Sequence, residues 1–266
     1  MAASPNPRPL FVLVQPRADR LLTAAVQLLI VGVFGWMAVL GALQFWAPPR
    51  WTNQRRAEVA AVLVAPLAVF WTWRGYVGRY HTVVVRPDAI ELRKGRTRRR
   101  VRPSDVLALV GDGGIDLGGG DLIVWKRLSI LTAEGRDVLE FHQRDNAAIY
   151  RALHATCPRA WGLPFPARLE PPDPAARPDG AAASRVGLGM IGRSLRRRIG
   201  RNAALGLGLV VGCLAVVWLV SRSPAAAESA KGLVFPIVGV VVGMMLMADA
   251  VRCSRVARTV RRMENG

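Results

Sequence analysis

The chain has few of the residue types from which catalytic and metal sites are commonly built. Its 266 residues include three histidines and three cysteines, and Asp and Glu together number 18 against 37 Lys and Arg. The cysteines form no C-x-x-C pair, and the histidines fall in no metal-binding spacing: His81, His142 and His154. Neither a Walker A lysine loop nor a G-x-S-x-G nucleophile elbow occurs. We therefore predict no cofactor, no metal site and no enzymatic activity.

A glycine-rich segment at 111–121 is the one stretch whose composition suggests a ligand loop. Its acidic residues, Asp112, Asp116 and Asp121, do not match the spacing of a calcium-binding loop. No Lys-Ser or Lys-Thr pair follows the glycines, as a phosphate-binding loop would require. We interpret the segment as a flexible hairpin loop.

Four long apolar runs decide the class of the protein. They cover residues 21–46, 57–73, 203–220 and 233–250. About 20 helical residues cross a hydrocarbon core of roughly 30 Å, so each run is long enough or nearly so. Short connections join the runs in pairs, which predicts two transmembrane hairpins, 21–74 and 202–250. Asp249 ends the fourth run, and we expect it to pair with Arg252 three residues later.

The distribution of positive charge predicts the orientation in the membrane. The formal net charge is +19, and segment 75–200 holds 22 Lys and Arg against 13 Asp and Glu. Segments 1–20 and 251–266 are also basic. Because Lys and Arg accumulate on the cytoplasmic side, we expect a multi-pass protein of the inner (plasma) membrane with both termini in the cytoplasm. One connection opposes this assignment, with Arg50, Arg55 and Arg56.

Residues 79–145 have the pattern of short antiparallel strands. The candidate strands are RYHTVVVRP, AIELRKG, TRRRVRP, SDVLALV and three further strands within DLIVWKRLSILTAEGRDVLEFH. Residues 145–156 then carry an apolar stripe at helical spacing: Ala148, Ile149, Ala152 and Leu153. We expect a helix there, capped by Asp145 or Asn146.

This order of elements resembles the bacterial pleckstrin-homology-like domains that stand beside transmembrane hairpins. The similarity rests on an apolar pair ending in an aromatic residue and Arg, then on YHTVVVRPDAIELRKG and DVLEFHQRDNAAIYRALH. The resemblance implies a half-open, seven-stranded antiparallel β-barrel over 75–156, with the final helix closing one end. With the four spans it implies an α+β membrane protein. It also implies an assembly or scaffold role rather than a reaction.

Two segments connect this domain to the second hairpin. Six prolines between positions 160 and 180 favour an extended linker over 157–183. Segment 184–201 mixes apolar side chains with Arg193, Arg196, Arg197 and Arg198. It suits a basic amphipathic helix lying on the inner leaflet, or only the positive flank of the third span.

Arginine clusters are the candidate binding residues. On the strand TRRRVRP, alternation places Arg98, Arg100 and Arg102 on one face, and Arg96 precedes them. Together with the four arginines of 184–201, they suit either anionic phospholipid headgroups or an acidic partner. A plain solvated face is the alternative. We do not expect nucleic-acid binding, because no exposed aromatic residues interleave with the arginines.

Paired glycines predict close packing of the last two spans. Gly208 and Gly212 lie four apart in the third run, as do Gly239 and Gly243 in the fourth. The contact would lie within the hairpin or between copies of a homo-oligomer. We therefore expect a non-enzymatic membrane protein whose cytoplasmic domain mediates lipid or protein contacts and assembly. The alternative is an accessory subunit of a larger membrane transport or envelope complex.

Overall fold

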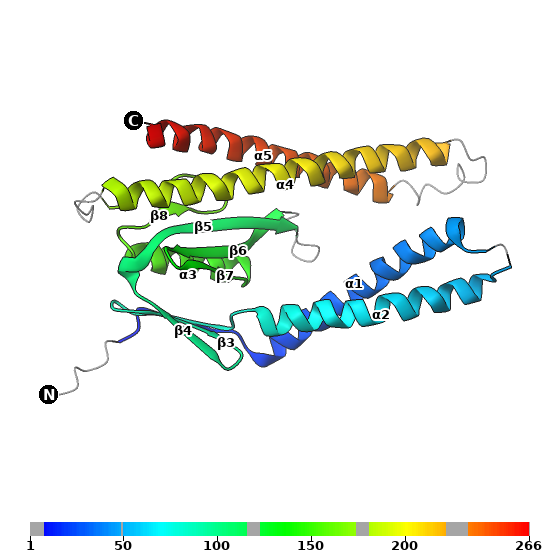
Figure 1. Ribbon diagram of the computed structural model, residues 1–266, viewed down its shortest axis with the longest axis horizontal. Helices are drawn as coiled ribbons and strands as arrows, with labels where there is room; N and C mark the ends of the chain where they lie inside the picture. Colours follow the sequence, from blue (N-terminus) through cyan, green and yellow to red (C-terminus); the bar gives the residue numbers. More distant parts are fainter. Residues whose placement is uncertain (1–7, 49, 116–122, 174–180, 222–233, 266) are drawn as a thin grey trace. The chain divides into compact units, whose positions relative to one another are not determined.

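The computed structural model describes residues 8–48, 50–115, 123–173, 181–221 and 234–265 (Figure 1). This described chain contains five α-helices and eight strands. It divides into two compact parts. Each part contains one helical hairpin and most of the residues of one four-stranded sheet. The first part consists of Val12–Val84 and Glu91–Arg100, and the second lies mainly after Val101.

In the first part, α1 (Arg17–Trp46) and α2 (Asn53–Gly78) form an antiparallel hairpin. The Trp36 indole nitrogen donates to the carbonyl of Ala57, 3.1 Å away, and so joins the two helices. Helix α2 continues through Pro66. Its buried side follows helical spacing: Ala60, Val64, Ala68 and Thr72.

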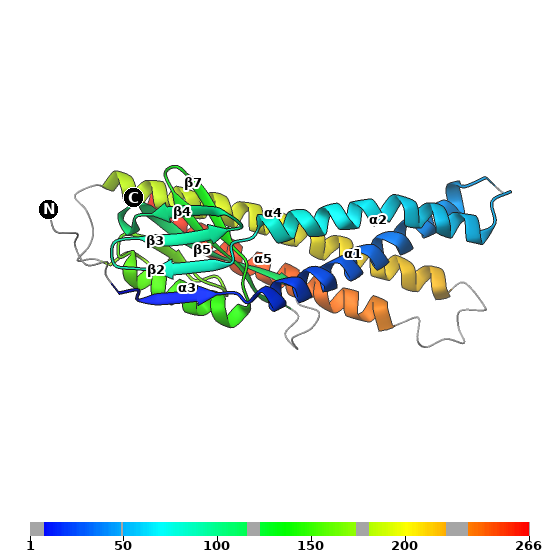
Figure 2. The ribbon, with the colours of Figure 1, turned by 90° about the horizontal axis from the view of Figure 1, so that it is seen from below.

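The sheet of the first part has the strand order β1-β2-β3-β4, visible in Figure 2. Its strands are β1 (Phe11–Val14), β2 (Thr82–Val85), β3 (Ile90–Lys94) and β4 (Thr97–Val101). Gly95 stands in the tight turn between β3 and β4 with a φ of 56°, a conformation that favours glycine. The strands predicted for RYHTVVVRP, AIELRKG and TRRRVRP are thereby confirmed.

The sheet of the second part has the order β7-β6-β5-β8. A 3-10 turn (Pro103–Asp105) leads into the first of these strands, which are β5 (Val106–Ile115), β6 (Ile123–Thr132), β7 (Gly135–Leu139) and β8 (Trp161–Leu163). Strand β8 runs parallel to β5, whereas β5, β6 and β7 are antiparallel. The described strands therefore make two four-stranded sheets and not a closed barrel. The α+β class is confirmed, but the half-open, seven-stranded barrel implied by the pleckstrin-like resemblance is not confirmed, because the described strands form two four-stranded sheets.

Two local predictions about this sheet are wrong. The glycine-rich segment is not a loop from residue 111 onward, because β5 continues to Ile115 and pairs there with β6. Residues 116–122, with Asp116 and Asp121, lie outside the described chain. The segment DLIVWKRLSILTAEGRDVLEFH forms two strands instead of three, with one turn at Ala133–Glu134.

Helix α3 (Gln143–Thr156) confirms the helix predicted for 145–156. It packs on β6 and β5 through its apolar stripe, in which Ile149 and Leu153 are fully buried. The predicted cap is wrong, because the helix begins earlier, with His142 at the N-cap. The Asn146 side chain instead donates from Nδ2 to the carbonyl of Phe141, at 2.9 Å.

The second hairpin consists of α4 (Ala181–Ser221) and α5 (Val234–Asn265), which lie side by side in Figures 1 and 2. Helix α4 has 41 residues. At 1.5 Å per residue it is about 60 Å long, about twice the thickness of a hydrocarbon core. Only part of this helix can therefore lie within a bilayer.

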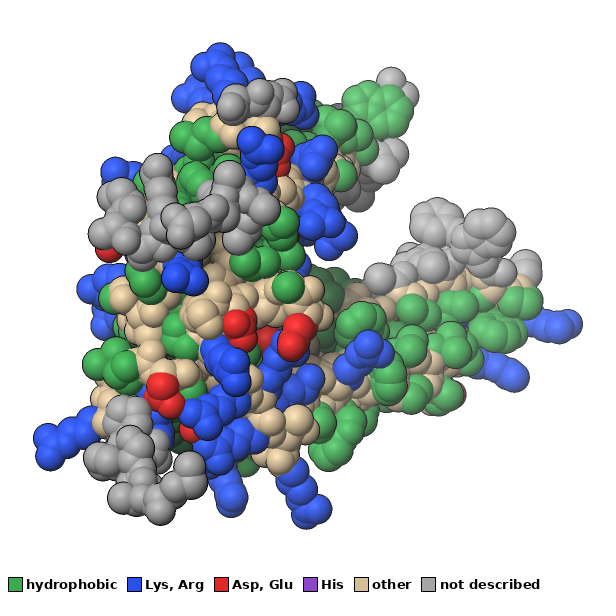
Figure 3. Space-filling view, turned by 60° about the vertical axis from the view of Figure 1, so that its left-hand side comes forward, with side chains coloured by type: hydrophobic (Ala, Val, Ile, Leu, Met, Phe, Trp, Pro, Cys, Tyr) green, Lys and Arg blue, Asp and Glu red, His purple; other side chains and the backbone are tan. Residues whose placement is uncertain are grey.

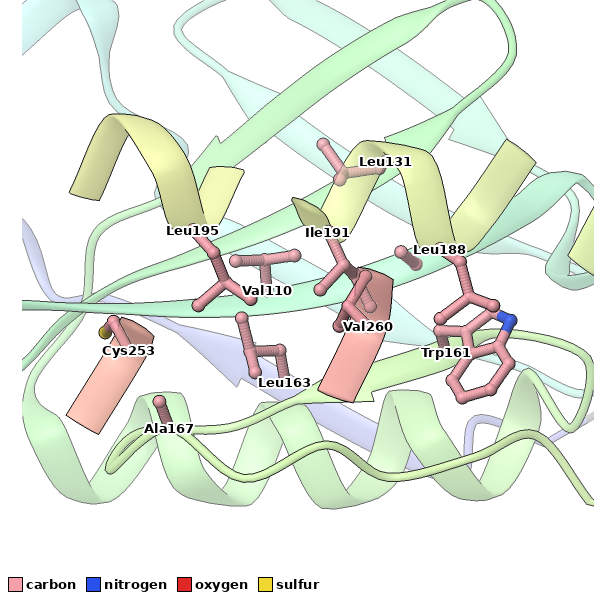
Figure 4. Packing of buried hydrophobic residues seen from close by; sticks show 11 residues of the cluster. Val110, Leu131, Trp161, Leu163, Ala167, Leu188, Ile191, Leu195, Cys253 and Val260 are labelled. Carbon is pink, nitrogen blue, oxygen red and sulfur yellow. The ribbon is translucent and has the colours of Figure 1, made fainter. Parts of the chain in front are cut away.

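The first third of α4 covers the second sheet (Figure 4). Leu188, Ile191 and Leu195 are buried at helical spacing against side chains of the sheet and of the segment after α3. Their partners in this cluster include Val110, Leu131, Trp161, Leu163, Ala167, Cys253 and Val260. Full burial of a large apolar side chain contributes about 1.5–3 kcal/mol, so this contact holds α4 firmly on the sheet.

This packing corrects three sequence interpretations. The segment 157–183 is not simply an extended linker, because β8 and Ala167 belong to the core. The apolar side of 184–201 packs on the sheet, so it is not available to lie on a leaflet as an amphipathic helix. Segment 251–266 continues α5 as far as Asn265 and buries Cys253 and Val260.

Four helices of the described chain, α1, α2, α4 and α5, are long and apolar enough to cross a membrane. They coincide with the four apolar runs of the sequence. Their outward side chains are apolar, as expected for lipid contact, and on α4 they include Leu207, Val211 and Leu214. The chain is therefore compatible with a multi-pass membrane protein.

Only one of the two predicted glycine pairs lies at the contact between α4 and α5. A Cβ on Gly243 would stand 2.7 Å from the carbonyl oxygen of Gly206, and a Cβ on Gly239 would collide with the Cys213 side chain. A Cβ on Gly208 or Gly212 would meet no heavy atom within 4 Å. The helices therefore approach closely where Gly206 of α4 meets Gly243 of α5. Gly208 and Gly212 face away from this contact.

We predict that Gly243→Ala weakens the α4–α5 hairpin, because the methyl group forces two backbones apart. Overpacking of this kind costs about 1–3 kcal/mol, which a lowered midpoint of thermal unfolding in detergent would report. Gly208→Ala is the matched control and should be neutral or slightly stabilising, since alanine favours a helix. Equal midpoints for the two variants would contradict this packing.

Candidate functional site at the junction of the second hairpin and its sheet

A buried ion pair joins the two helices of the second hairpin. Arg198 of α4 is 4% exposed and Asp249 of α5 is 8% exposed. The guanidinium donates from Nε and Nη2 to the two oxygens of the carboxylate, at 2.9 and 2.8 Å. The third contact of Arg198 runs from Nη1 to the carbonyl of Gly111 on β5, at 3.0 Å. One side chain thus holds α4, α5 and the sheet together.

Asp249 receives further hydrogen bonds that complete its environment. The Asn202 side chain donates from Nδ2 at 2.8 Å, and the Cys253 thiol lies 3.7 Å from the same oxygen. The predicted pairing with Arg252 is wrong, and Arg252 is exposed. A buried carboxylate needs partners that are buried with it, and Arg198 and Asn202 of the facing helix supply its main hydrogen bonds.

A second ion pair extends the network toward the surface. Arg201, whose side chain is 39% exposed, donates from Nη1 and Nη2 to both oxygens of Asp112, at 3.0 and 2.9 Å. Its Nε donates to Oδ1 of Asn202, at 3.0 Å. Asp112 also lies 3.5 Å from Nε of Arg198. Two arginines and two aspartates therefore balance in charge. We name Arg198, Arg201, Asn202, Asp112 and Asp249 the junction network.

The glycines of β5 make room for this network. Phe165 lies under Arg198, with the guanidinium carbon 5.0 Å from the ring centroid. A Cβ on Gly113 would collide with the same ring. Gly111 offers its carbonyl to Arg198. Gly111 and Gly113 of β5 thus serve close packing around the stacked Arg198 and Phe165 side chains.

Beside the junction network, the second part of the chain presents a basic surface. We name Arg127, Arg136, Arg193, Arg196 and Arg197 the basic face; all five are exposed. In the view of Figure 3, blue Lys and Arg side chains far outnumber red Asp and Glu side chains among the hydrophobic and other surface atoms. Arg127 pairs with Glu140 at 2.7 Å.

Arg136 is the most strongly perturbed member of the basic face. Partial burial lowers the pKa of its guanidinium, and repulsion from Arg127, Arg197 and Arg201 lowers that pKa further. Asp112 is the one neighbour that acts in the opposite direction. The lowered pKa therefore reflects burial first, and the neighbouring arginines add to it.

The arginines predicted from the sequence fall into separate groups. Arg193, Arg196 and Arg197 are exposed on α4, whereas Arg198 is buried in the junction network and cannot bind lipid. Arg96, Arg98, Arg100 and Arg102 lie on or beside β4 and are exposed. Arg98 pairs with the buried Glu91 at 2.6 Å. Sequence reasoning missed Arg127, Arg136 and Asn202. It also missed the pairing of Asp112 with Arg201, because the proximity of these residues depends on the sheet register and on α4.

Cys157 and Tyr150 are buried titratable groups outside the junction network. Among the described residues, no group of three or more His, Cys, Asp or Glu side chains is placed to hold a metal ion. Burial raises the pKa of the Cys157 thiol to about 12, so it is not a thiolate nucleophile near neutral pH. Tyr150 donates to Glu170 at 2.5 Å, and its pKa is raised by burial and by this bond.

Comparison with protein-family models, with curated proteins and with solved structures finds no match for this chain. The pleckstrin-like resemblance therefore stays a hypothesis drawn from the sequence.

We predict that Asp249→Asn destabilises the protein by about 3–5 kcal/mol, because it leaves the Arg198 charge buried without a partner. Thermal or denaturant unfolding of the full chain in detergent measures the loss. Arg252→Gln is the control and should leave stability within about 0.5 kcal/mol, as for other exposed positions.

A double variant, Arg198→Met with Asp249→Leu, should recover most of the stability lost by Asp249→Asn, since no unpaired charge then remains. If Asp249→Asn and Arg252→Gln were equally mild, the buried pair would not exist as described.

Proposed function

We propose that this chain is a non-enzymatic, multi-pass protein of the inner membrane whose cytoplasmic domain binds anionic phospholipid headgroups. The observation that carries the proposal is the continuity of α4. One unbroken helix runs from the apolar stretch at 203–220 into the segment packed on the sheet, and the junction network locks it there. The basic face is thereby held beside the point where the apolar stretch ends.

The position of the charges supports contact with headgroups rather than with a soluble anion. Arg201 is the last charged residue of α4 before its apolar stretch, and Arg197 precedes it by about one turn. A headgroup layer borders the hydrocarbon core on each side, so guanidiniums at the end of an apolar helix meet phosphates there. Each Arg near an anionic leaflet contributes about 1 kcal/mol.

The distribution of charge along the chain supports the cytoplasmic placement. Both segments that leave the second hairpin toward the sheet are arginine-rich, at 193–201 and at 252–262. The connection between α4 and α5 contains far fewer basic residues. By the positive-inside rule, the sheet side of this hairpin is cytoplasmic. We interpret the domain as a scaffold that holds the basic face at the inner leaflet.

The test is lipid selectivity of the full chain. We expect protein reconstituted in nanodiscs of mixed phosphatidylcholine and phosphatidylglycerol to retain phosphatidylglycerol about fivefold or more over its bulk share, as native mass spectrometry would show. High salt should reduce the enrichment, because exposed charges are screened. Retention of both lipids in their bulk proportion, at low and high salt alike, would remove the headgroup function.

The exposed glycines Gly208 and Gly212 favour a second candidate, an accessory subunit of a larger membrane complex. These positions have open space around them on a helix that already has a partner on its other side. Small residues four apart let a further helix approach closely.

We predict for this candidate that Gly212→Cys forms an oxidative cross-link to a second copy or to a co-purifying chain. Trp218→Cys, another exposed position on α4, is the control and should not cross-link. A cross-link at neither position, with no partner after purification, would exclude the candidate.

A further inference from the structure

Two arginines beside the junction network have no carboxylate partner in the described part of the chain. Arg136 of β7 donates from Nε and Nη2 to the hydroxyl oxygen of Ser129, at 3.0 and 2.8 Å. Ser129 is fully buried and neutral, so it orients the guanidinium without balancing its charge. Arg197 is exposed on α4, and no described carboxylate reaches it.

The fold brings both arginines to the rim of the junction network. In the β5–β6 ladder, Val110 is paired with Ser129, and two residues further along Asp112 is paired with Arg127. Because side chains alternate between the faces of a sheet, Ser129, Asp112 and Arg127 lie on the same face. Arg201 is bonded to Asp112, and Arg197 lies one turn earlier on the same side of α4.

The carboxylates of this region are already committed to other arginines. Asp249 is held by Arg198, Asp112 by Arg201, and Glu140 by Arg127. The positive charges of Arg136 and Arg197 remain. A group with one or two negative charges and several acceptor oxygens would balance them.

We propose that Arg136, Arg197 and Arg201 bind a single phosphate group at this rim. The inference rests on the proposed function and names the ligand chemistry of the basic face. Guanidinium groups present planar pairs of N–H donors that match phosphate oxygens. Arg136 is pre-oriented by Ser129, and Arg201 is bound to Asp112 with its side chain 39% exposed. The phosphate comes from an anionic headgroup or from a free phosphate in solution.

The experiment uses the full chain in nanodiscs. It compares the double variant Arg136→Gln/Arg197→Gln with the double control variant Arg258→Gln/Arg262→Gln. Both control arginines are exposed on α5, so each variant removes two charges from an exposed surface. Binding is measured by native mass spectrometry for phosphatidylglycerol and for diacylglycerol hemisuccinate, an anionic lipid without phosphate. Inorganic phosphate is titrated separately into phosphatidylcholine nanodiscs.

We expect the wild type and the control to retain one tightly held phosphatidylglycerol, and the Arg136–Arg197 variant to hold it about tenfold more weakly or worse. Binding of inorganic phosphate with the same dependence on Arg136 and Arg197 would assign the site to free phosphate as its source. Equal retention of the hemisuccinate lipid would overturn the choice of phosphate.

The outcome separates this inference from the proposed function. Enrichment of phosphatidylglycerol that falls equally in both double variants would overturn the site and leave the general headgroup function standing. Absence of enrichment in the wild type would overturn the function itself. Arg197 is exposed, so Arg197→Gln should not move the unfolding midpoint. Arg136→Gln also removes two hydrogen bonds to the buried Ser129 hydroxyl, so the midpoint of the double variant is measured alongside binding. Should the double variant unfold, Arg197→Glu alone, on the helix surface, gives the same test.

Discussion

The pair of Arg198 and Asp249 is the interaction on which the second part of the chain depends. A buried pair of opposite charges is favourable only when every polar atom finds a partner, because both ions lose their hydration. Here Asn202, the Gly111 carbonyl and the Phe165 ring complete the environment. The pair therefore specifies one arrangement of α4, α5 and β5. Sliding one helix along the other would leave a buried charge without its partner.

The same helix face that carries Arg198 also explains how α4 changes environment along its length. Leu188, Ile191 and Leu195 are apolar and packed on the sheet, Arg198 and Asn202 are polar and paired, and Gly206 then meets Gly243 of α5. One stripe at helical spacing thus passes from a soluble core, through a polar junction, to a close helix contact of membrane type. This continuity keeps the basic face at a fixed position along the helix.

Local patterns predicted the elements whose packing is also local. The four apolar runs, the strands from β2 to β4 and helix α3 follow from hydropathy and periodicity. The junction network could not be predicted, because Arg198 and Asp249 are 51 residues apart and Arg198 and Gly111 are 87 apart. The apolar side of 184–201 has the same pattern whether it meets a leaflet or a sheet. From the sequence, the glycines of β5 indicate a loop, because the Phe165 ring that packs against Gly113 comes from a distant part of the chain.

The most direct measurement is the distance between spin labels on α4 and on the sheet, recorded by double electron–electron resonance in nanodiscs. Arg185 and Glu134 are exposed positions for the two labels. We expect one narrow distance distribution that is independent of lipid composition and that broadens when Asp249→Asn breaks the pair. A broad distribution in the wild type, or one that shifts when anionic lipid is added, would mean that α4 is not fixed to the sheet.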